Sequence, residues 1–342
     1  MDRQRPLHIA YIGNGKSTNR YHIPFVLTRP YAKIRTIWSR SGRQEWPLVD
    51  GTHYTQDLED IWEDDNLDLV VITTPGSSHY DYAKQALLHG KNVLVEKPFV
   101  ETYDQAQELF DLAKDKGLLL QSYQNRRFDS DYLTALSVIE SGKLGRLHEV
   151  EMHYDYYRPE VPLNATFSKI DSYLYSHGAH TLDQAIAYFG QPQSVHADVR
   201  QLLGPGRMND YFDLDLYYES GLKVSIKSSY FRVKARPSFV LYGDKGMFVK
   251  ASQDRQEEHL KLFYMPGKAG FGQDLPEHYG ILTYMDDAGA YHEEKVPSID
   301  GDYGRYYDAL YDSIILGKDK FVTDEQTLAV MKILEEEISK LQ

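Results

Sequence analysis

The stretch LHIAYIGNGKST, residues 7–18, decides the fold, because an apolar run leads directly into a glycine turn. The apolar run predicts a buried strand over 9–13. The turn Gly13-Asn14-Gly15-Lys16-Ser17-Thr18 matches two-thirds of the G-x-G-x-x-G dinucleotide fingerprint. The first glycine permits a tight turn and the second lets backbone amides approach a pyrophosphate, whereas Thr18 replaces the third. The alternative reading is a glycine turn that binds no ligand.

Outward from this stretch, the first 125 residues alternate short apolar runs with segments of helical period. The predicted strands are 9–13, 34–39, 69–74, 92–96 and 118–122, with a short extra strand near 53–55. Thr102 followed by Gln105 predicts a capping box for a helix that Gly117 ends. Such alternation is typical of a doubly wound parallel sheet, which binds ligands outside the carboxyl ends of its strands. We therefore expect an α/β Rossmann domain over residues 1–125.

Residues 126–342 follow a different pattern, in which apolar and polar residues alternate. The alternating runs at 150–156, 212–219 and 222–227 predict antiparallel strands with one solvated face, where acids and lysines pair across the sheet. Asp244-Lys245-Gly246 and Asp287-Ala288-Gly289 predict hairpin turns. Two closing helices are expected near 303–316 and 323–341. This half is therefore a second domain, whose C-terminal helix could pack back on the first.

Composition limits the function classes. A chain of 342 residues favours two domains. The net charge of −13 argues against a nucleic-acid partner or an anionic membrane surface, since both favour basic patches. The sequence has no apolar run long enough to span a membrane and no signal-peptide pattern at its N-terminus. The absence of cysteine suits the cytoplasm, which is the expected location.

The end of the second strand indicates the dinucleotide. An NAD site usually has an Asp or Glu there for the ribose 2′-hydroxyl, but this strand ends in Ser39 and Arg40, with Arg43 close behind. A hydroxyl and a guanidinium suit a 2′-phosphate. We therefore expect NADP(H) to be preferred, with NAD(H) still possible. The alternative is that both arginines are ordinary solvated cations.

Two further strand ends open on the same crevice. The first is Thr73-Thr74-Pro75, with His79 at the start of the next helix, and the second is Glu96-Lys97-Pro98. A lysine ammonium at this position can hold a substrate oxygen and favour the alkoxide during hydride transfer. The alternative is a lysine that reaches solvent from a strand end. The sequence leaves open whether the Lys97–Pro98 bond is cis.

Three segments now carry a family resemblance. TTPGSSH (73–79), VEKPF (95–99) and YQNRRFD (123–129), behind a glycine strand, resemble the glucose–fructose oxidoreductase, inositol dehydrogenase and rhizopine-catabolism (Gfo/Idh/MocA) family. The resemblance covers essentially the whole chain. It implies an NAD(P)-binding Rossmann domain followed by a substrate-binding and oligomerisation domain on a large open, mostly antiparallel sheet. That sheet often packs against another subunit, so a homodimer or a higher homo-oligomer is expected.

The segment YSHGAHTLDQ (175–184) opens a predicted helix that ends at Gly190. Leu182, Ala185, Ile186 and Phe189 form its buried stripe, and His180, Asp183 and Gln184 share the opposite side. The segment resembles the family's D-x-G-x-H element, whose histidine is the acid/base. Gly178 and His180 match, but Ser176 stands where the family has aspartate. Asp183, a water or another acid must then hold the tautomer of His180, and His177 is a further candidate proton carrier.

The resemblance implies hydride transfer between NADP(H) and a secondary alcohol or ketone of a sugar, polyol or related small molecule. Lys97 and His180 are the expected catalytic residues, meeting beside one nicotinamide. The expected cofactor-binding residues are Gly13, Asn14, Gly15, Lys16, Ser17, Thr18, Ser39, Arg40, Thr73, Thr74, Pro75, His79, Glu96, Lys97 and Asn125. Weaker candidates for the substrate pocket are Arg127, Tyr156, Arg158 and Tyr303.

Three alternatives stay open. A metal site built from His177, His180 and Asp183 has poor support, so no metal is predicted. Some members of the family cleave glycosides with the help of bound NAD⁺, and one is a cofactor-sensing regulator without catalysis. The missing aspartate at Ser176 keeps the regulator open. Substrate identity and reaction direction do not follow from the sequence.

Overall fold

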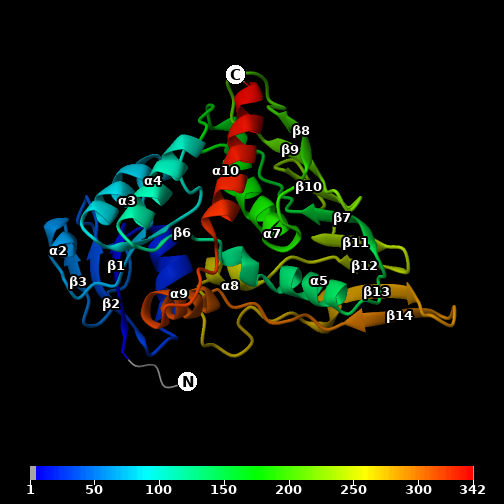
Figure 1. Cartoon of the computed structure of the whole chain (residues 1–342), viewed down its shortest axis with the longest axis horizontal. Coiled ribbons are helices and arrows are strands. Elements are labelled where there is room, and N and C mark those ends of the chain that lie inside the picture. Colours follow the sequence, from blue (N-terminus) through cyan, green and yellow to red (C-terminus); the bar gives the residue numbers. More distant parts are fainter. Residues whose placement is uncertain (1–4, 342) are drawn as a thin grey trace. The chain divides into compact units, whose positions relative to one another are not determined.

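The computed structural model describes residues 5–341, which form two compact units (Figure 1). The first unit runs to Asn125 and adds residues 260–269 and 303–331. The second unit holds residues 126–259, 270–302 and 332–341. The sequence placed everything after residue 125 in the second domain, allowing only for the C-terminal helix. The first unit therefore also recruits a short segment and the helix that follows Tyr303.

The first unit contains a six-stranded sheet in the order β3-β2-β1-β4-β5-β6, with every pairing parallel. Its strands are β1 (Leu7–Ile12), β2 (Ala32–Trp38), β3 (His53–Thr55), β4 (Leu69–Ile72), β5 (Asn92–Val95) and β6 (Leu120–Ser122). Each lies where a strand was predicted, the short β3 included, which confirms the doubly wound fold. Every residue of β4 is fully buried, as expected for a parallel sheet covered on both faces.

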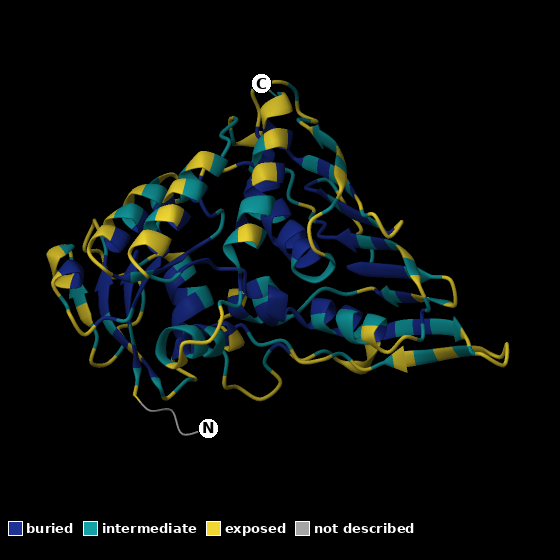
Figure 2. Ribbon diagram, viewed as in Figure 1, coloured by how far each residue is buried: buried dark blue, intermediate teal, exposed yellow. Residues whose placement is uncertain are grey.

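The helices of the first unit begin and end close to the predicted signals. They are the π-helical turn η1 (Ser17–His22), α1 (Ile23–Val26), α2 (Glu59–Trp62), the short turn η2 (Gly76–Ser78), α3 (His79–Leu88), α4 (Tyr103–Asp115), α9 (Gly304–Leu316) and the start of α10 (Asp324–Ile338). The capping box of Thr102 and Gln105 at the start of α4 is confirmed. Helices α3 and α4 pack against each other and expose their outer residues, while the strands beside them are buried (Figure 2).

The second unit is built on an eight-stranded sheet in the order β14-β13-β12-β11-β7-β10-β9-β8. Its strands are β7 (Leu147–His153), β8 (Ser194–Arg200), β9 (Tyr211–Tyr217), β10 (Lys223–Ser229), β11 (Phe239–Gly243), β12 (Gly246–Lys250), β13 (Gly280–Met285) and β14 (Tyr291–Val296). Its helical elements are η3 (Asn125–Phe128, which begins in the first unit), α5 (Ser130–Glu140), α6 (Glu160–Leu163), η4 (Leu174–Gly178), α7 (Ala179–Phe189), α8 (Gln256–Lys261, which ends in the first unit), η5 (Pro276–His278) and η6 (Ser339–Leu341).

Both predicted hairpins are confirmed, since β11 pairs with β12 and β13 with β14. The expectation that all three alternating runs form antiparallel strands is wrong in one place, because β10 pairs with β7 in parallel. The cross-strand charge pairs are present, with Lys227 Nζ 3.0 Å from Asp213 and Lys223 Nζ 3.4 Å from Glu149. Among the described residues, none of the helices combines the length and the apolar character needed to cross a membrane.

Helix α7 differs from its prediction. His180, Asp183 and Gln184 were expected on a polar side, but all three are buried, at 5%, 1% and 5% exposure. The side chains of Asp183 and Gln184 meet protein partners instead of water, as buried polar groups generally must. Arg127 binds Asp183, and the Gln184 side-chain amide donates to the backbone carbonyl of Arg126 at 2.7 Å. The helix is therefore buried on all sides from Ala179 to Ile186, and only its last turn is partly exposed.

Candidate functional site

A cavity of about 500 Å³ lies at the carboxyl ends of β1, β2 and β4 in the first unit. It is lined by residues expected from the sequence, namely Gly13, Asn14, Gly15, Ser39, Arg40, Thr73, Thr74 and Pro75. Arg43, weighed with Arg40, also lines it. The sequence did not single out its other lining residues, Trp38, Ser41, Glu45, Ser77, Ser78 and Tyr82. The position is the one where open α/β sheets bind their ligands.

The glycine turn of this cavity has the shape that a bound dinucleotide requires. Gly13 has φ of +124°, and a Cβ there would come within 2.6 Å of the Thr73 hydroxyl oxygen. Any side chain at this position is therefore excluded by both conformation and space. A Cβ on Gly15 would meet nothing within 4 Å, so the backbone beside it is open. The turn thus fits a pyrophosphate lying against backbone amides.

Thr18, which replaces the third glycine of the fingerprint, is fully buried. Its hydroxyl donates to the carbonyl of Gly13 at 2.7 Å and lies 2.7 Å from the hydroxyl of Thr73. The close packing that glycine usually allows is therefore replaced by hydrogen bonds that tie the turn to β4. No pattern in the sequence indicated that hydrogen bonds of Thr18 would take the place of the close packing of a glycine.

The far end of the cavity is basic. Arg40 and Arg43 are exposed, Ser39 is half-buried, and Glu45 also lines the cavity. A pair of guanidinium groups with a hydroxyl suits a phosphate ester, because planar N–H donors can bind two oxygens at once. Lys16 is exposed next to the glycine turn but does not line the cavity as Gly15 does.

His79 was expected to contact a cofactor, but its ring joins two strand ends. It is 1% exposed, with Nδ1 2.8 Å from the carbonyl oxygen of Pro98 and Nε2 2.8 Å from that of Thr74. The ring therefore holds the segments after β4 and β5 together. The Lys97–Pro98 peptide bond beside it is cis.

Glu96, at the end of β5, is buried at 8% exposure and accepts hydrogen bonds on both oxygens. Oε1 accepts from the Ser17 hydroxyl at 2.5 Å and lies 3.0 Å from His22 Nε2. Oε2 accepts from the backbone N–H of Lys97 at 2.9 Å. Burial raises the pKa of Glu96, but these partners outweigh it and hold the pKa at about 2. The carboxylate is therefore ionised at neutral pH.

In the second unit, Arg127 and Asp183 form a bidentate ion pair. Arg127 Nε and Nη2 donate to the two carboxylate oxygens of Asp183, each at 2.7 Å. Both groups are nearly fully buried, so Arg127 serves this pair rather than an open pocket. Asp183, considered as the acid that holds His180, likewise has both oxygens engaged by the guanidinium. Asn125, just before this segment, is buried at 7% exposure.

Ser176 and His177 form a pair of their own. The Ser176 hydroxyl oxygen lies 2.8 Å from His177 Nδ1. The His177 ring is surrounded by tyrosine rings, at centroid distances of 4.5 Å to Tyr173, 5.2 Å to Tyr156 and 5.6 Å to Tyr230. The position that carries aspartate in the family motif therefore carries a hydroxyl linked to a second imidazole.

The remaining candidates for the substrate pocket, Tyr156, Arg158 and Tyr303, lie in two different places. Tyr156 belongs to this tyrosine cluster, and the Arg158 guanidinium lies 4.2 Å from its ring centroid, within cation–π range. Tyr303 was expected at a rim, but it is fully buried in the first unit, 5.3 Å from the ring of Phe25. It is a core residue of that unit. Within residues 5–341, no three His, Asp or Glu side chains are grouped to hold a metal ion.

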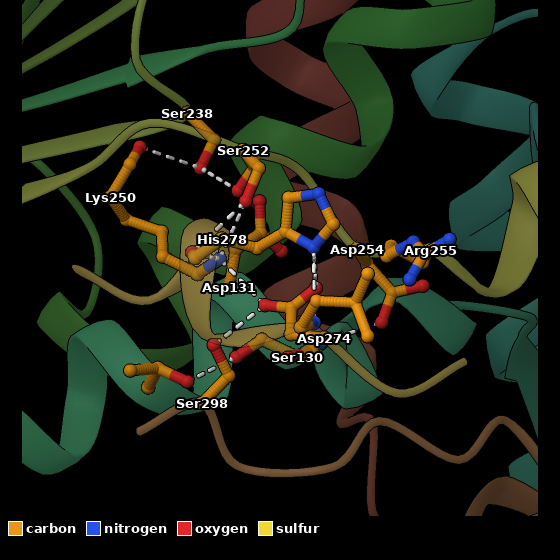
Figure 3. A network of polar contacts seen from close by, with 12 residues as sticks. Ser130, Asp131, Ser238, Lys250, Ser252, Asp254, Arg255, Asp274, His278 and Ser298 are labelled. Atoms are coloured by element: carbon orange, nitrogen blue, oxygen red, sulfur yellow. Dashed lines mark hydrogen bonds and ion pairs between the residues drawn. The ribbon is translucent and has the colours of Figure 1, made fainter. Parts of the chain in front are cut away.

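A second polar network lies inside the second unit, around Lys250 at the end of β12 (Figure 3). Lys250 is fully buried and its ammonium donates to three oxygens, the Ser252 hydroxyl at 2.9 Å, Asp274 Oδ2 at 2.8 Å and the His278 carbonyl at 2.7 Å. Ser298 also donates to Asp274 Oδ2, at 2.6 Å. The network thus links three loops to the sheet. We interpret its role as stabilising the fold.

Asp254 belongs to the same polar region. It accepts from the backbone N–H of Ser130 at 2.8 Å and from that of Gln256 at 2.7 Å. Removal of its carboxylate from water raises the pKa of Asp254 to about 7, and the nearby charge of Asp131 adds to this rise. The region therefore holds more acid than its one buried lysine neutralises.

A Rossmann sheet with a glycine turn, two arginines lining its cavity and a glutamate followed by a lysine is the combination expected of a nucleotide-dependent oxidoreductase. Comparison with known proteins supplies the family. Residues 7–124 match the NAD-binding Rossmann fold of the Gfo/Idh/MocA oxidoreductase family, and residues 137–338 match its C-terminal alpha/beta domain. The chain belongs to this family and is an oxidoreductase, related to inositol dehydrogenases.

Three relatives show how far the similarity extends. The uncharacterised oxidoreductase YhhX of Escherichia coli is 44% identical over 332 residues, covering 96% of this chain and 95% of the relative. A scyllo-inositol 2-dehydrogenase (NADP(+)), IolW of Bacillus subtilis, is 31% identical, covering 96% and 92%. The crystal structure of an oxidoreductase from Bacillus cereus superposes with a TM-score of 0.92 at 39% identity, covering 97% and 96%.

Proposed function

We propose that this protein is an NADP(H)-dependent dehydrogenase or reductase acting on a secondary alcohol or ketone of a polyol or sugar. The observation that carries the proposal is the first unit's cavity, which joins an open glycine turn to Ser39 and Arg40 at the end of β2. The open backbone beside Gly15 would take the pyrophosphate, and Ser39, Arg40 and Arg43 would take the 2′-phosphate. Relatives include both NADP(+) and NAD(+) enzymes, so the preference rests on these residues.

Bound NADP⁺ supplies a hydride acceptor at its nicotinamide ring. In the proposed reaction, His180 takes the proton from the substrate hydroxyl, and the Lys97 ammonium stabilises the negative charge that develops on that oxygen. His177, whose Nδ1 lies 2.8 Å from the Ser176 hydroxyl oxygen, is proposed as a further proton carrier, because the family aspartate is absent at position 176. That Lys97 and His180 meet over one substrate stays a prediction.

A substrate screen tests the activity. We expect NADP⁺ to be reduced by a member of a panel of polyols and sugars that includes scyllo-inositol, and NADPH to be oxidised by the corresponding keto compound. The measurement is absorbance at the nicotinamide band. Binding of NADPH without turnover of any panel member would favour a cofactor-sensing regulator. Copurified cofactor with glycoside cleavage and no net turnover would favour the redox-assisted glycosidase.

Replacing Arg40 with alanine tests the cofactor preference. We expect the Kd for NADPH to rise by ~10–100-fold while the Kd for NADH changes little, because a charge-assisted hydrogen bond contributes about 1.5–3 kcal/mol. Fluorescence titration with the two cofactors measures both constants. The matched control is Arg35→Gln, which removes a guanidinium bound to Asp64 at 2.7 Å outside the cavity and should leave both constants unchanged. Tighter binding of NADH than NADPH by the unaltered protein would refute the assignment.

A further inference from the structure

One buried histidine of the first unit is not explained by the proposed reaction. His22, the last residue of η1, is fully buried, and its ring stacks on Tyr123 with centroids 4.1 Å apart. Its two nitrogens face different partners. Nε2 lies 3.0 Å from Glu96 Oε1, and Nδ1 lies 2.6 Å from the hydroxyl of Tyr307.

The contacts continue beyond Tyr307, which is a residue of α9. Its hydroxyl lies 2.9 Å from that of Tyr11, on β1, and both tyrosines are fully buried. Burial raises the pKa of both phenols, so both stay protonated at neutral pH. The structure therefore places Tyr11, Tyr307, His22 and Glu96 in one unbroken row, drawn from three segments of the chain that are far apart in sequence.

The charge of Glu96 fixes the direction of the hydrogen bond between Glu96 and His22. Glu96 is ionised, and an ionised carboxylate can only accept, so His22 must carry a proton on Nε2 and donate it. Nδ1 of the same ring pairs with the hydroxyl of Tyr307, and that hydroxyl pairs with the hydroxyl of Tyr11. Hydrogen bonds linked in this way strengthen one another in a low-dielectric interior.

The carboxylate held by His22 also contacts two segments of the proposed site. The oxygen that faces His22 also accepts from Ser17, next to the glycine turn, and the other oxygen accepts from the backbone of Lys97. We propose that His22 and Tyr307 are positioning residues that fix the Glu96 carboxylate, and that Glu96 thereby locks the glycine turn to the lysine-bearing end of β5. This inference rests on the proposed function, because the two segments are the proposed cofactor and substrate contacts.

The test compares four variants. His22→Leu removes the donor to Glu96, His22→Gln keeps an amide donor of similar reach, and Tyr307→Phe removes the hydroxyl that pairs with His22 Nδ1. Tyr311→Phe is the matched control, because Tyr311 is a buried tyrosine of the same helix whose hydroxyl donates to the carbonyl of Arg5 at 3.0 Å. Circular dichroism and thermal melting establish that each variant folds. If His22→Leu does not fold, Tyr307→Phe and its control carry the comparison.

Two readouts are independent of catalysis. In protein with ¹⁵N-labelled histidine, NMR should find the His22 proton on Nε2 before any nucleotide is added. Fluorescence titration should then show the Kd for NADPH raised ~10-fold or more in His22→Leu, raised less in Tyr307→Phe, and largely restored in His22→Gln. Tyr311→Phe should bind NADPH like the unaltered protein.

The contrary results are equally distinct. A proton found only on Nδ1 would overturn the inference, and so would His22→Leu or Tyr307→Phe binding NADPH as tightly as Tyr311→Phe. Failure of His22→Gln to bind better than His22→Leu would show that the ring only fills space, which also overturns it. If the unaltered protein does not bind NADPH, the proposed function fails, and the NMR result alone then decides whether His22 holds Glu96.

Discussion

Lys97→Ala is expected to lower the turnover number by ~10²–10⁴-fold, the range that general acid–base groups contribute. The variant removes the ammonium proposed to hold the substrate oxygen, but it leaves the backbone N–H that donates to Glu96 Oε2 at 2.9 Å. The glycine turn and its basic pocket end are untouched. We therefore expect the Kd for NADPH to change little while kcat falls, measured on the substrate that the screen identifies.

His180→Ala is the companion variant for this prediction. If both side chains act on one oxygen in one step, the double variant should be scarcely slower than the slower single variant, since residues that act as a unit are not additive. Lys84→Ala, which removes an exposed lysine paired with Glu108, is the control and should retain normal turnover. Near-normal rates in Lys97→Ala and His180→Ala would reject both proposed roles.

Lys250→Met should destabilise the protein by about 3–5 kcal/mol, the usual cost of removing one partner from a buried ion pair. The side chains of Lys250 and Asp274 are 0% and 1% exposed, and their ion pair is 2.8 Å long. Methionine has a similar reach but no charge, so the Asp274 carboxylate would stay buried without its cation. Urea denaturation followed by circular dichroism measures the change in the free energy of unfolding.

Two controls separate charge burial from packing. Lys250→Met combined with Asp274→Leu removes both charges and should recover a large part of the lost stability. Lys227→Met breaks the pair with Asp213 on the partly exposed face of the same sheet and should cost less than about 1 kcal/mol. If Lys250→Met and Lys227→Met lowered the free energy of unfolding equally, the buried network would contribute no more to stability than a partly exposed ion pair.

Much of the fold could be predicted because its signals are local. The apolar run before Glu96 and the capping box of Thr102 and Gln105 each lie within a few consecutive residues, and both appear where expected. The parallel pairing of β10 with β7 could not be predicted, because alternation shows which residues of a strand are buried but not which strand lies beside it. The polar face assigned to α7 failed for a related reason, since Arg127 neutralises Asp183 from another segment.

Some residues of the candidate site could be predicted from the sequence and others could not, for the same reason. The glycine turn, Ser39 and Arg40 were recognisable because their chemistry follows from their position at a strand end. His22 and Tyr307 were not, because 285 positions separate them and no periodic pattern marks either one. Thr18 was noted only as a departure from the fingerprint, and its hydrogen bonds to Gly13 and Thr73 emerged only from the fold.

The return of residues 303–331 to the first unit has a consequence for how this chain is made. Helix α9 brings a set of tyrosines to that unit, with Tyr306 donating to the carbonyl of Ser122 at 2.5 Å and Tyr307 beside Tyr11. A ribosome delivers these partners only after residues 126–302, which carry every strand of the second unit's sheet, have been synthesised. The nucleotide-binding unit therefore starts before the second unit in the chain but is completed only after the second unit's strands exist.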